Sequence, residues 1–178
     1  MSTMYVNKVQ ELNVGSGVHI PGHPIQIAYD TKTIGNDTNT QGVDIAYLNV
    51  STVGGFGSAV TVQSLNITPK YANSKILLEW TGQFRMNMSA GGGGLNGFFG
   101  KDGSNLLTVG GNHDAVLFRY SDTQLSGMYQ SESCRWLFTA GQTTQMTLDF
   151  RVSCYNSNAS LQLSHDGIAT LTATEIAV

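Results

Sequence analysis

Residues 76–86 read ILLEWTGQFRM, and this stretch decides the fold class. Alternate residues are apolar or glycine and include Trp80 and Phe84, while Glu79 and Arg85 lie between them. This is a period of two, which places successive side chains on opposite faces of a sheet. Helical spacing would give Glu79 and Arg85 no consistent face. The stretch therefore predicts an antiparallel β-strand with one face buried in the core and one face exposed to solvent.

Residues 146–154, MTLDFRVSC, repeat the pattern, with Leu148 and Phe150 on an apolar face and Asp149 and Arg151 on a wet one. No long segment shows helical periodicity. Short strands joined by turns predict an all-β, antiparallel β-sandwich or jelly roll. Weaker strands of the same kind are expected at residues 60–67, 116–120, 134–139, 160–164 and 168–177.

The composition fits one β domain and excludes several other classes of protein. The chain has 178 residues, of which 21 are glycine, and only 12% are charged. That charged share is about half of the ~25% found in average proteins. It argues against a coiled coil and against a charged disordered tail. The net charge of −3 offers no basic patch, so nucleic acid is not an expected partner.

The first 27 residues have a different character from the rest. They hold two of the three prolines and show little alternation. Such a segment gains little burial by itself to offset its ordering entropy. We therefore expect an extended N-terminal arm over residues 1–27 that docks on a neighbouring molecule, followed by a jelly-roll domain over residues 28–178. The apolar residues expected to make this docking contact are Tyr5, Val6, Val9, Leu12, Val18, Ile20 and Ile25.

Targeting signals and cysteines indicate where the chain is made. No apolar run reaches the ~18 residues that a membrane-spanning helix needs, so no membrane partner is expected. Lys8 and Glu11 lie where a signal peptide would have its apolar stretch. Synthesis in the cytoplasm would leave Cys134 and Cys154 as thiols. Both fall on the apolar side of their strands, which predicts core packing.

The histidines do not form an expected metal or catalytic site. His19 and His23 have helical spacing for a metal pair, but Pro21 between them precludes the helix. His113 and His165 each precede an aspartate, and neighbours in a strand point to opposite faces. No nucleophile elbow or phosphate-binding motif is present. The chain is therefore expected to be non-enzymatic, with no cofactor and no metal.

Two glycine-containing stretches are expected to form turns. Gly91–Gly94 has no adjacent helix N-terminus that could bind phosphate, so a flexible loop tip is the expectation. Residues 101–105, KDGSN, look superficially like a calcium loop but lack its further acidic ligands. A hairpin turn is the better interpretation.

Four segments, taken in order, resemble bacteriophage virion proteins. Residues 65–78, LNITPKYANSKILL, resemble a turn and strand that recur in these proteins. Residues 97–103, GFFGKDG, are similar to their hairpin, and residues 171–176, LTATEI, to their closing strand. Residues 6–10, VNKVQ, are similar to the start of small tail-associated proteins of marine and freshwater phages. The chain departs from the family at residues 138–141 and in its tetraglycine, both in regions where partner choice would reside.

The resemblance implies a jelly roll related in shape to tumour-necrosis-factor domains and assembled as a homotrimer on the virion surface. The sequence holds more large aromatic residues than one small core requires, although core packing alone could accommodate them. Each is expected at a trimer interface or in the core, and both alternatives stay open. These residues are Trp80, Phe84, Phe118, Tyr120, Trp136 and Phe138.

Three functions remain to be weighed. The first is a capsid decoration (cement) protein, whose arm clamps neighbouring subunits of the major capsid protein. The second is a tail-fibre or tail-tip protein, whose Asn, Ser, Thr and aromatic loops bind a host-surface receptor or glycan. A small-ligand carrier or an isolated enzyme is the least favoured. In the first two functions the partners are other virion proteins, either capsid or tail.

Overall fold

The computed structural model describes residues 21–35, 45–46, 49–50, 53–88, 93–106, 116–120, 125–155, 159–163 and 167–178. Within these residues, the secondary structure consists of β-strands and one short 3-10 turn, η1 (Phe56–Ser58). The strands are β1 (Pro24–Gly35), β2 (Ile45–Ala46), β3 (Asn49–Val50), β4 (Val60–Ile67), β5 (Lys75–Met88), β6 (Gly93–Lys101), β7 (Ser104–Asn105), β8 (Val116–Tyr120), β9 (Leu125–Thr139), β10 (Met146–Cys154), β11 (Ala159–Leu163) and β12 (Gly167–Ile176).

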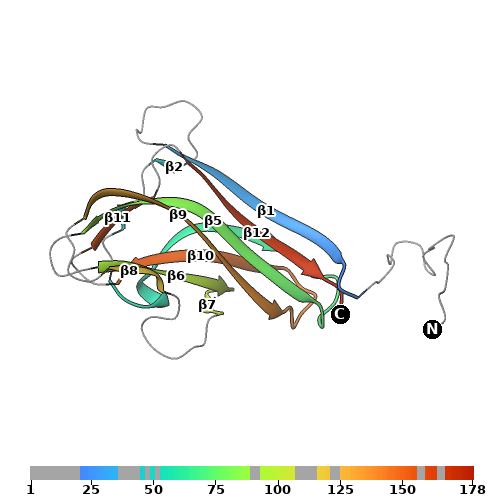
Figure 1. The fold of residues 1–178 in the computed structure, drawn as a ribbon. Coiled ribbons are helices and arrows are strands. Elements are labelled where there is room, and N and C mark those ends of the chain that lie inside the picture. The colour runs from blue at the N-terminus through green and yellow to red at the C-terminus, as the bar shows by residue number, and fades with distance from the viewer. Residues whose placement is uncertain are drawn as a thin grey trace, which may run out of the picture.

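The strands form two sheets that pack as a sandwich (Figure 1). Sheet A has the order β2-β1-β12-β5-β11-β3, and β9 pairs with β5. Sheet B has the order β4-β10-β6-β7, and β8 pairs with β6. The long strands pair antiparallel, as β1–β12, β12–β5, β5–β9 and β10–β6 do. The sets β1-β12-β5-β9 and β4-β10-β6-β8 are those of a jelly roll, so the predicted fold class is confirmed.

The strongest sequence patterns lie in the middle of this fold. The predicted strand 76–86 falls within β5, the central strand of sheet A, and 146–154 coincides with β10, the centre of sheet B. The apolar sets of both strands point inward. Trp80 and Phe150 stack with ring centroids 4.3 Å apart, and Phe84 lies 5.0 Å from Trp80. Each such buried side chain contributes roughly 1.5–3 kcal/mol.

Strand β1 extends into the stretch expected to be an arm. It begins at Pro24 rather than at residue 28. Backbone hydrogen bonds from Gly22 N to the carbonyl of Ala177, and from Ala177 N to that of His23, attach this stretch to the end of β12. The sequence did not indicate this strand, because a strand can be held by ladder bonds without a regular apolar alternation.

Strand β6 corrects the expectation of a loop tip at Gly91–Gly94. Gly93 and Gly94 pair with Tyr120 and Arg119 of β8, so the expectation is wrong for these two residues. Gly91 and Gly92 lie outside the described residues. The physical reason is burial on both faces, since residues 93–100 are all buried and small residues permit close packing there.

The predicted hairpin turn after β6 is confirmed. Asp102 and Gly103 have φ values of 51° and 80°, and Lys101 pairs with Ser104 across the turn. Positive φ at both central residues is the reason an Asp-Gly pair is favoured in two-residue hairpins. Thr147 N donates to Asp102 Oδ1 at 2.8 Å, which joins the turn to the start of β10.

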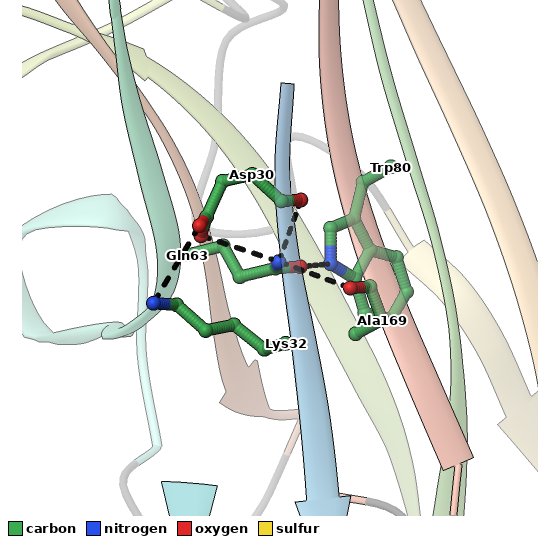
Figure 2. A network of polar contacts seen from close by, with 5 residues as sticks. All are labelled: Asp30, Lys32, Gln63, Trp80 and Ala169. Carbon is green, nitrogen blue, oxygen red and sulfur yellow. Dashed lines mark hydrogen bonds and ion pairs between the residues drawn. The ribbon is translucent and has the colours of Figure 1, made fainter. Parts of the chain in front are cut away.

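A buried glutamine joins the two sheets inside the core (Figure 2). The pairing of β10 with β4 shifts register between Phe150 and Arg151, and Gln63 of β4 is 2% exposed. Gln63 Oε1 accepts a hydrogen bond from Trp80 Nε1 at 2.8 Å, and its Nε2 donates to the carbonyls of Asp30 and Ala169, each at 3.1 Å. Because both ends of the amide are bonded, its burial costs little, and it connects β4 to β1, β5 and β12.

Candidate functional site

The outer face of sheet A carries most of the exposed large apolar residues that the structure describes. Four of the six lie there, and the other two are Val53 and Val178. We call this surface the outer A face and define it by residues 27, 29, 77, 79, 135, 137 and 168. The four exposed residues are Ile27 (60% exposed), Tyr29 (72%), Leu137 (54%) and Ile168 (64%).

The strand register sets these residues in rows across the sheet. In the first row Ile27 pairs with Thr174, Thr174 with Leu77, and Leu77 with Leu137. Directly opposed residues on one sheet face have Cβ atoms about 5 Å apart. The row is therefore a continuous strip from β1 across β12 and β5 to β9, with an exposed apolar side chain at each end.

The second row carries the charge of this face. Tyr29 pairs with Thr172, Thr172 with Glu79, and Glu79 with Arg135. The β1 edge therefore presents an aromatic ring, and the β9 edge a guanidinium. In the neighbouring row, Lys75 Nζ donates to Thr139 Oγ1 at 2.7 Å. Opposite charges stand side by side here, so the outer A face has little net charge.

A shallow, open depression of about 540 Å³ lies beyond these rows. Its lining is about equally polar and apolar, and includes hydroxyl, amide and carboxyl groups together with Ile168. Burial raises the pKa of Glu132, and a hydrogen bond with Gln130 partly offsets that rise. The lining residues are Thr81, Gly82, Gln83, Ser131, Glu132, Ser133 and Ile168.

Part of the outer face of sheet B, over β10 and β6, is in contrast covered by the chain itself. Residues 53–59, between β3 and β4, contact it. Ser153 Oγ donates to the carbonyl of Gly54 at 2.5 Å, and the ring of Phe56 meets Phe98 edge-on at 6.2 Å. As a result Phe98 and Ser153 have no exposed surface, although they point away from the core.

The same cover lies over an ion pair on β10, in which Asp149 is buried and Arg151 is partly buried. Arg151 Nε and Nη2 each donate to the Asp149 carboxylate at 2.9 Å, and the guanidinium lies 4.3 Å from the Phe56 ring centroid. This hydrogen bonding raises the pKa of Arg151, against a smaller effect of burial. The prediction that this face of β10 is exposed to solvent is therefore wrong for Asp149 and Ser153, because residues 53–59, which are far away in the sequence, lie over them.

A second buried carboxylate, Glu175 of β12, fixes one end of the sandwich. Its oxygens accept hydrogen bonds from Ser74 Oγ at 2.5 Å, from Gln26 Nε2 at 2.6 Å and from the backbone N of Lys70 at 2.9 Å. Tyr71 N adds a bond at 3.2 Å. Burial alone would raise the pKa of Glu175, but these donors outweigh it and leave the pKa below its ordinary value.

The residues singled out from the sequence fall into different environments. Trp80 and Phe84 are fully buried in the core, whereas Trp136 and Phe138 are half-buried and pack against it from β9. Phe118 and Tyr120 belong to β8, and their side chains lie outside the described residues. Ile25 is half-buried in β1. The other arm residues lie outside the described residues, namely Tyr5, Val6, Val9, Leu12, Val18 and Ile20.

Both cysteines are thiols that belong to the core or pack against it, as predicted. Burial raises the pKa of Cys154 to about 11. Burial, and then the charge of Glu132, raise that of Cys134 to about 12. Thiols with such values are poor nucleophiles. Among the described residues, no three His, Cys, Asp or Glu side chains gather to hold a metal. The described segments also contain no helix long and apolar enough to span a membrane.

The sequence did not predict that Ile27 and Tyr29 lie on the outer A face, for a specific reason. Ile27 was assigned to the arm, and Tyr29 belongs to a strand whose alternation is inverted. In β1 the polar residues Gln26 and Asp30 turn inward to bond Glu175 and Gln63, while Ile27 and Tyr29 turn outward. The sequence did contain a signal for this strand, because Gln26, Ala28 and Asp30 alternate with Ile27 and Tyr29.

Comparisons with known proteins add little. No protein-family model and no curated protein matches the chain. The chain is similar to the structure of infectious bursal virus derived T=1 particles, with a TM-score of 0.39, 12% identity, and coverage of 96% of this chain and 41% of that one. For the infectious bursal disease virus VP2 subviral particle the values are 0.38, 12%, 87% and 39%. The chain spans about two fifths of those proteins, and likeness this low carries no functional argument.

Proposed function

We propose that the chain is a non-enzymatic structural protein of a bacteriophage virion. In this proposal it is a homotrimeric capsid decoration (cement) protein on the particle surface, attached through its N-terminal arm. The observation that carries the proposal is the outer A face, where four large apolar side chains stand exposed on a charge-poor sandwich. Exposed apolar side chains gathered on one face of a sheet are typical of interaction sites.

The segments that resemble phage virion proteins support the proposal, because they meet in space. Glu175, in the segment 171–176, accepts hydrogen bonds from Lys70, Tyr71 and Ser74, all within the segment 65–78. The shared sequence features are thus the two halves of one structural contact. That makes a chance resemblance of separate short motifs less plausible.

The root of the arm has a defined position. Gly22 and His23 are hydrogen-bonded to Ala177, so the described chain at residues 22 and 23 is fixed beside the end of β12. An arm that docks from a fixed point loses less entropy on attachment than one on a flexible linker. Repetition over three copies would raise its avidity.

Deletion of residues 1–20 tests the arm. We expect the truncated chain to fold and to trimerise, because β1 and its bonds to Ala177 remain, but no longer to co-sediment with particles that lack the protein. Full-length protein is the control. Undiminished particle binding by the truncated chain would defeat the docking role.

Copy number separates the capsid location from the tail location. Gel densitometry of purified virions is expected to give an amount comparable with that of the major capsid protein. An amount that is a small fraction of it would place the chain in the tail and contradict decoration.

The depression at Ile168 favours a second candidate, a tail-fibre or tail-tip protein that binds a host-surface glycan. Its hydroxyl, amide and carboxyl groups are the chemistry that hydrogen-bonds a sugar. Under this alternative, soluble protein would inhibit phage adsorption, and a Ser133→Val substitution would abolish the inhibition. Lack of inhibition by the soluble protein would exclude it.

A further inference from the structure

We propose that the outer A face is the contact between copies of this chain, with its β1 edge in one copy set against the β9 edge of the next. This deepens the proposed function, since it rests on the homotrimer and names the surface that builds it. The occupant is a second copy of the chain, for three reasons that follow from the face itself.

The first reason is chemical complementarity between its two edges. The β1 edge carries Ile27 and Tyr29, and the β9 edge carries Leu137 and Arg135, in the same two rows. Apolar residues therefore meet apolar residues, and the guanidinium of one copy meets the tyrosine ring of the next. A guanidinium over an aromatic ring is a favourable contact. The two edges differ, which is what a head-to-tail cyclic interface requires.

The second reason is charge. Within the face, Glu79 and Arg135 stand opposite each other, so approach of an identical face brings no excess of like charge. A nucleic acid or an anionic lipid surface would need a cluster of cations. The outer A face has one cation, Arg135, and the neighbouring row adds Lys75. A strongly acidic or basic partner would meet no matching surface.

The third reason is geometry. The row of Ile27 and the row of Tyr29, with the two further rows that contain Thr170 and Ile168, span the interval from residue 168 to residue 174 of β12. At about 3.3 Å per residue this is roughly 20 Å along the strands, and four strands at about 4.8 Å spacing give a similar width. The area is several hundred Å² on each copy, which is at the low end for interfaces between proteins. It is also small enough for three copies to gather around one axis.

The test is the mass of purified full-length protein by size-exclusion chromatography with light scattering. Wild type is expected at three times the chain mass of 19.1 kDa. Ile27→Thr and Leu137→Thr keep strand propensity and remove apolar contact. Each is expected to raise the dissociation constant by about tenfold or more and to shift the protein toward monomer on dilution. Val53→Thr, at an exposed apolar residue outside this face, is the matched control and is expected to remain trimeric.

Circular dichroism and thermal unfolding establish that each variant is folded. If a threonine variant does not fold, Arg135→Ala serves in its place, because it removes the cation from the β9 edge without placing a second carboxylate opposite Glu79. Folded variants that dissociate while Val53→Thr does not would support the inference. A monomeric wild type, or folded variants that remain fully trimeric, would overturn it. Virion densitometry is independent of this measurement, so a trimer that is absent from particles would defeat only the proposed function.

Discussion

The two outer faces of this sandwich meet the same physical problem in different ways. On sheet B, a segment of the chain itself, residues 53–59, lies over Phe98 and over the Asp149–Arg151 pair. On sheet A, Ile27, Tyr29, Leu137 and Ile168 are left exposed. Covering a face from within stabilises the monomer. A face left exposed can contribute the same burial only in an assembly. The covered face therefore serves the stability of the monomer, and the exposed face is available for self-association.

The largest expected effect comes from breaking the covered face at its ion pair. Arg151→Ala leaves the buried Asp149 carboxylate without its bidentate partner and removes the guanidinium from Phe56. The free energy of unfolding should fall by about 3 kcal/mol, because an uncompensated charge stays buried. Arg135→Ala, on the exposed face, should cost under about 0.5 kcal/mol in the monomer. Urea unfolding of both variants measures the difference, and equal losses would contradict the comparison.

A single added methyl group should also disrupt the covered face. A Cβ at Gly100 would overlap the Asp149 carboxylate and approach the Phe56 ring. We therefore expect Gly100→Ala to lower the free energy of unfolding by about 2 kcal/mol. Gly57 lies in the covering segment with nothing near its Cβ position, so Gly57→Ala should be close to neutral. Thermal unfolding of the pair is the measurement, and a neutral Gly100→Ala would show that the cover is loosely packed.

The inner side of sheet A should respond to pH through Glu175. The hydrogen-bonded Glu175 has a pKa below its ordinary value, so its stabilisation is complete above about pH 4.3 and is lost as the pH falls through the lower folded-state pKa. Glu175→Gln should cost about 2 kcal/mol at pH 7, and the cost should shrink below about pH 4. Denaturant unfolding at several pH values measures it. A cost that does not change with pH would show that Glu175 acts through shape alone.

The smallest effect on the monomer is expected on the exposed face. Tyr29→Ser removes a side chain that is 72% exposed, so the free energy of unfolding of the monomer should change by less than about 0.5 kcal/mol. Its effect on self-association should be far larger. Tyr29→Phe retains the ring and should retain the assembly. Loss of monomer stability with Tyr29→Ser would place this residue in the fold and not in the contact.

The sequence predicted what depends on local alternation. Residues 76–86 and 146–154 became the central strands of the two sheets, with Trp80 and Phe150 stacked between them. It could not predict which outer face would be covered, because the contact of Phe56 with Phe98 joins residues that no local pattern links.

The candidate site was hidden for a related reason. In β1 the inward residues are polar, since Gln26 and Asp30 find buried partners on other strands. The usual alternation of apolar inside and polar outside is therefore reversed there. Only the register of β1 against β12 shows that Ile27 and Tyr29 point outward into the same rows as Leu77 and Glu79.

The most direct measurement is the reactivity of Tyr29 toward hydroxyl radicals, read by mass spectrometry over a dilution series of the full-length protein. In the single chain this side chain is exposed. Burial of the outer A face between copies predicts that Tyr29 is protected at concentrations where light scattering shows the trimer, and becomes reactive as the trimer dissociates. Equal reactivity of Tyr29 in trimer and monomer would contradict the proposal that this face joins the copies.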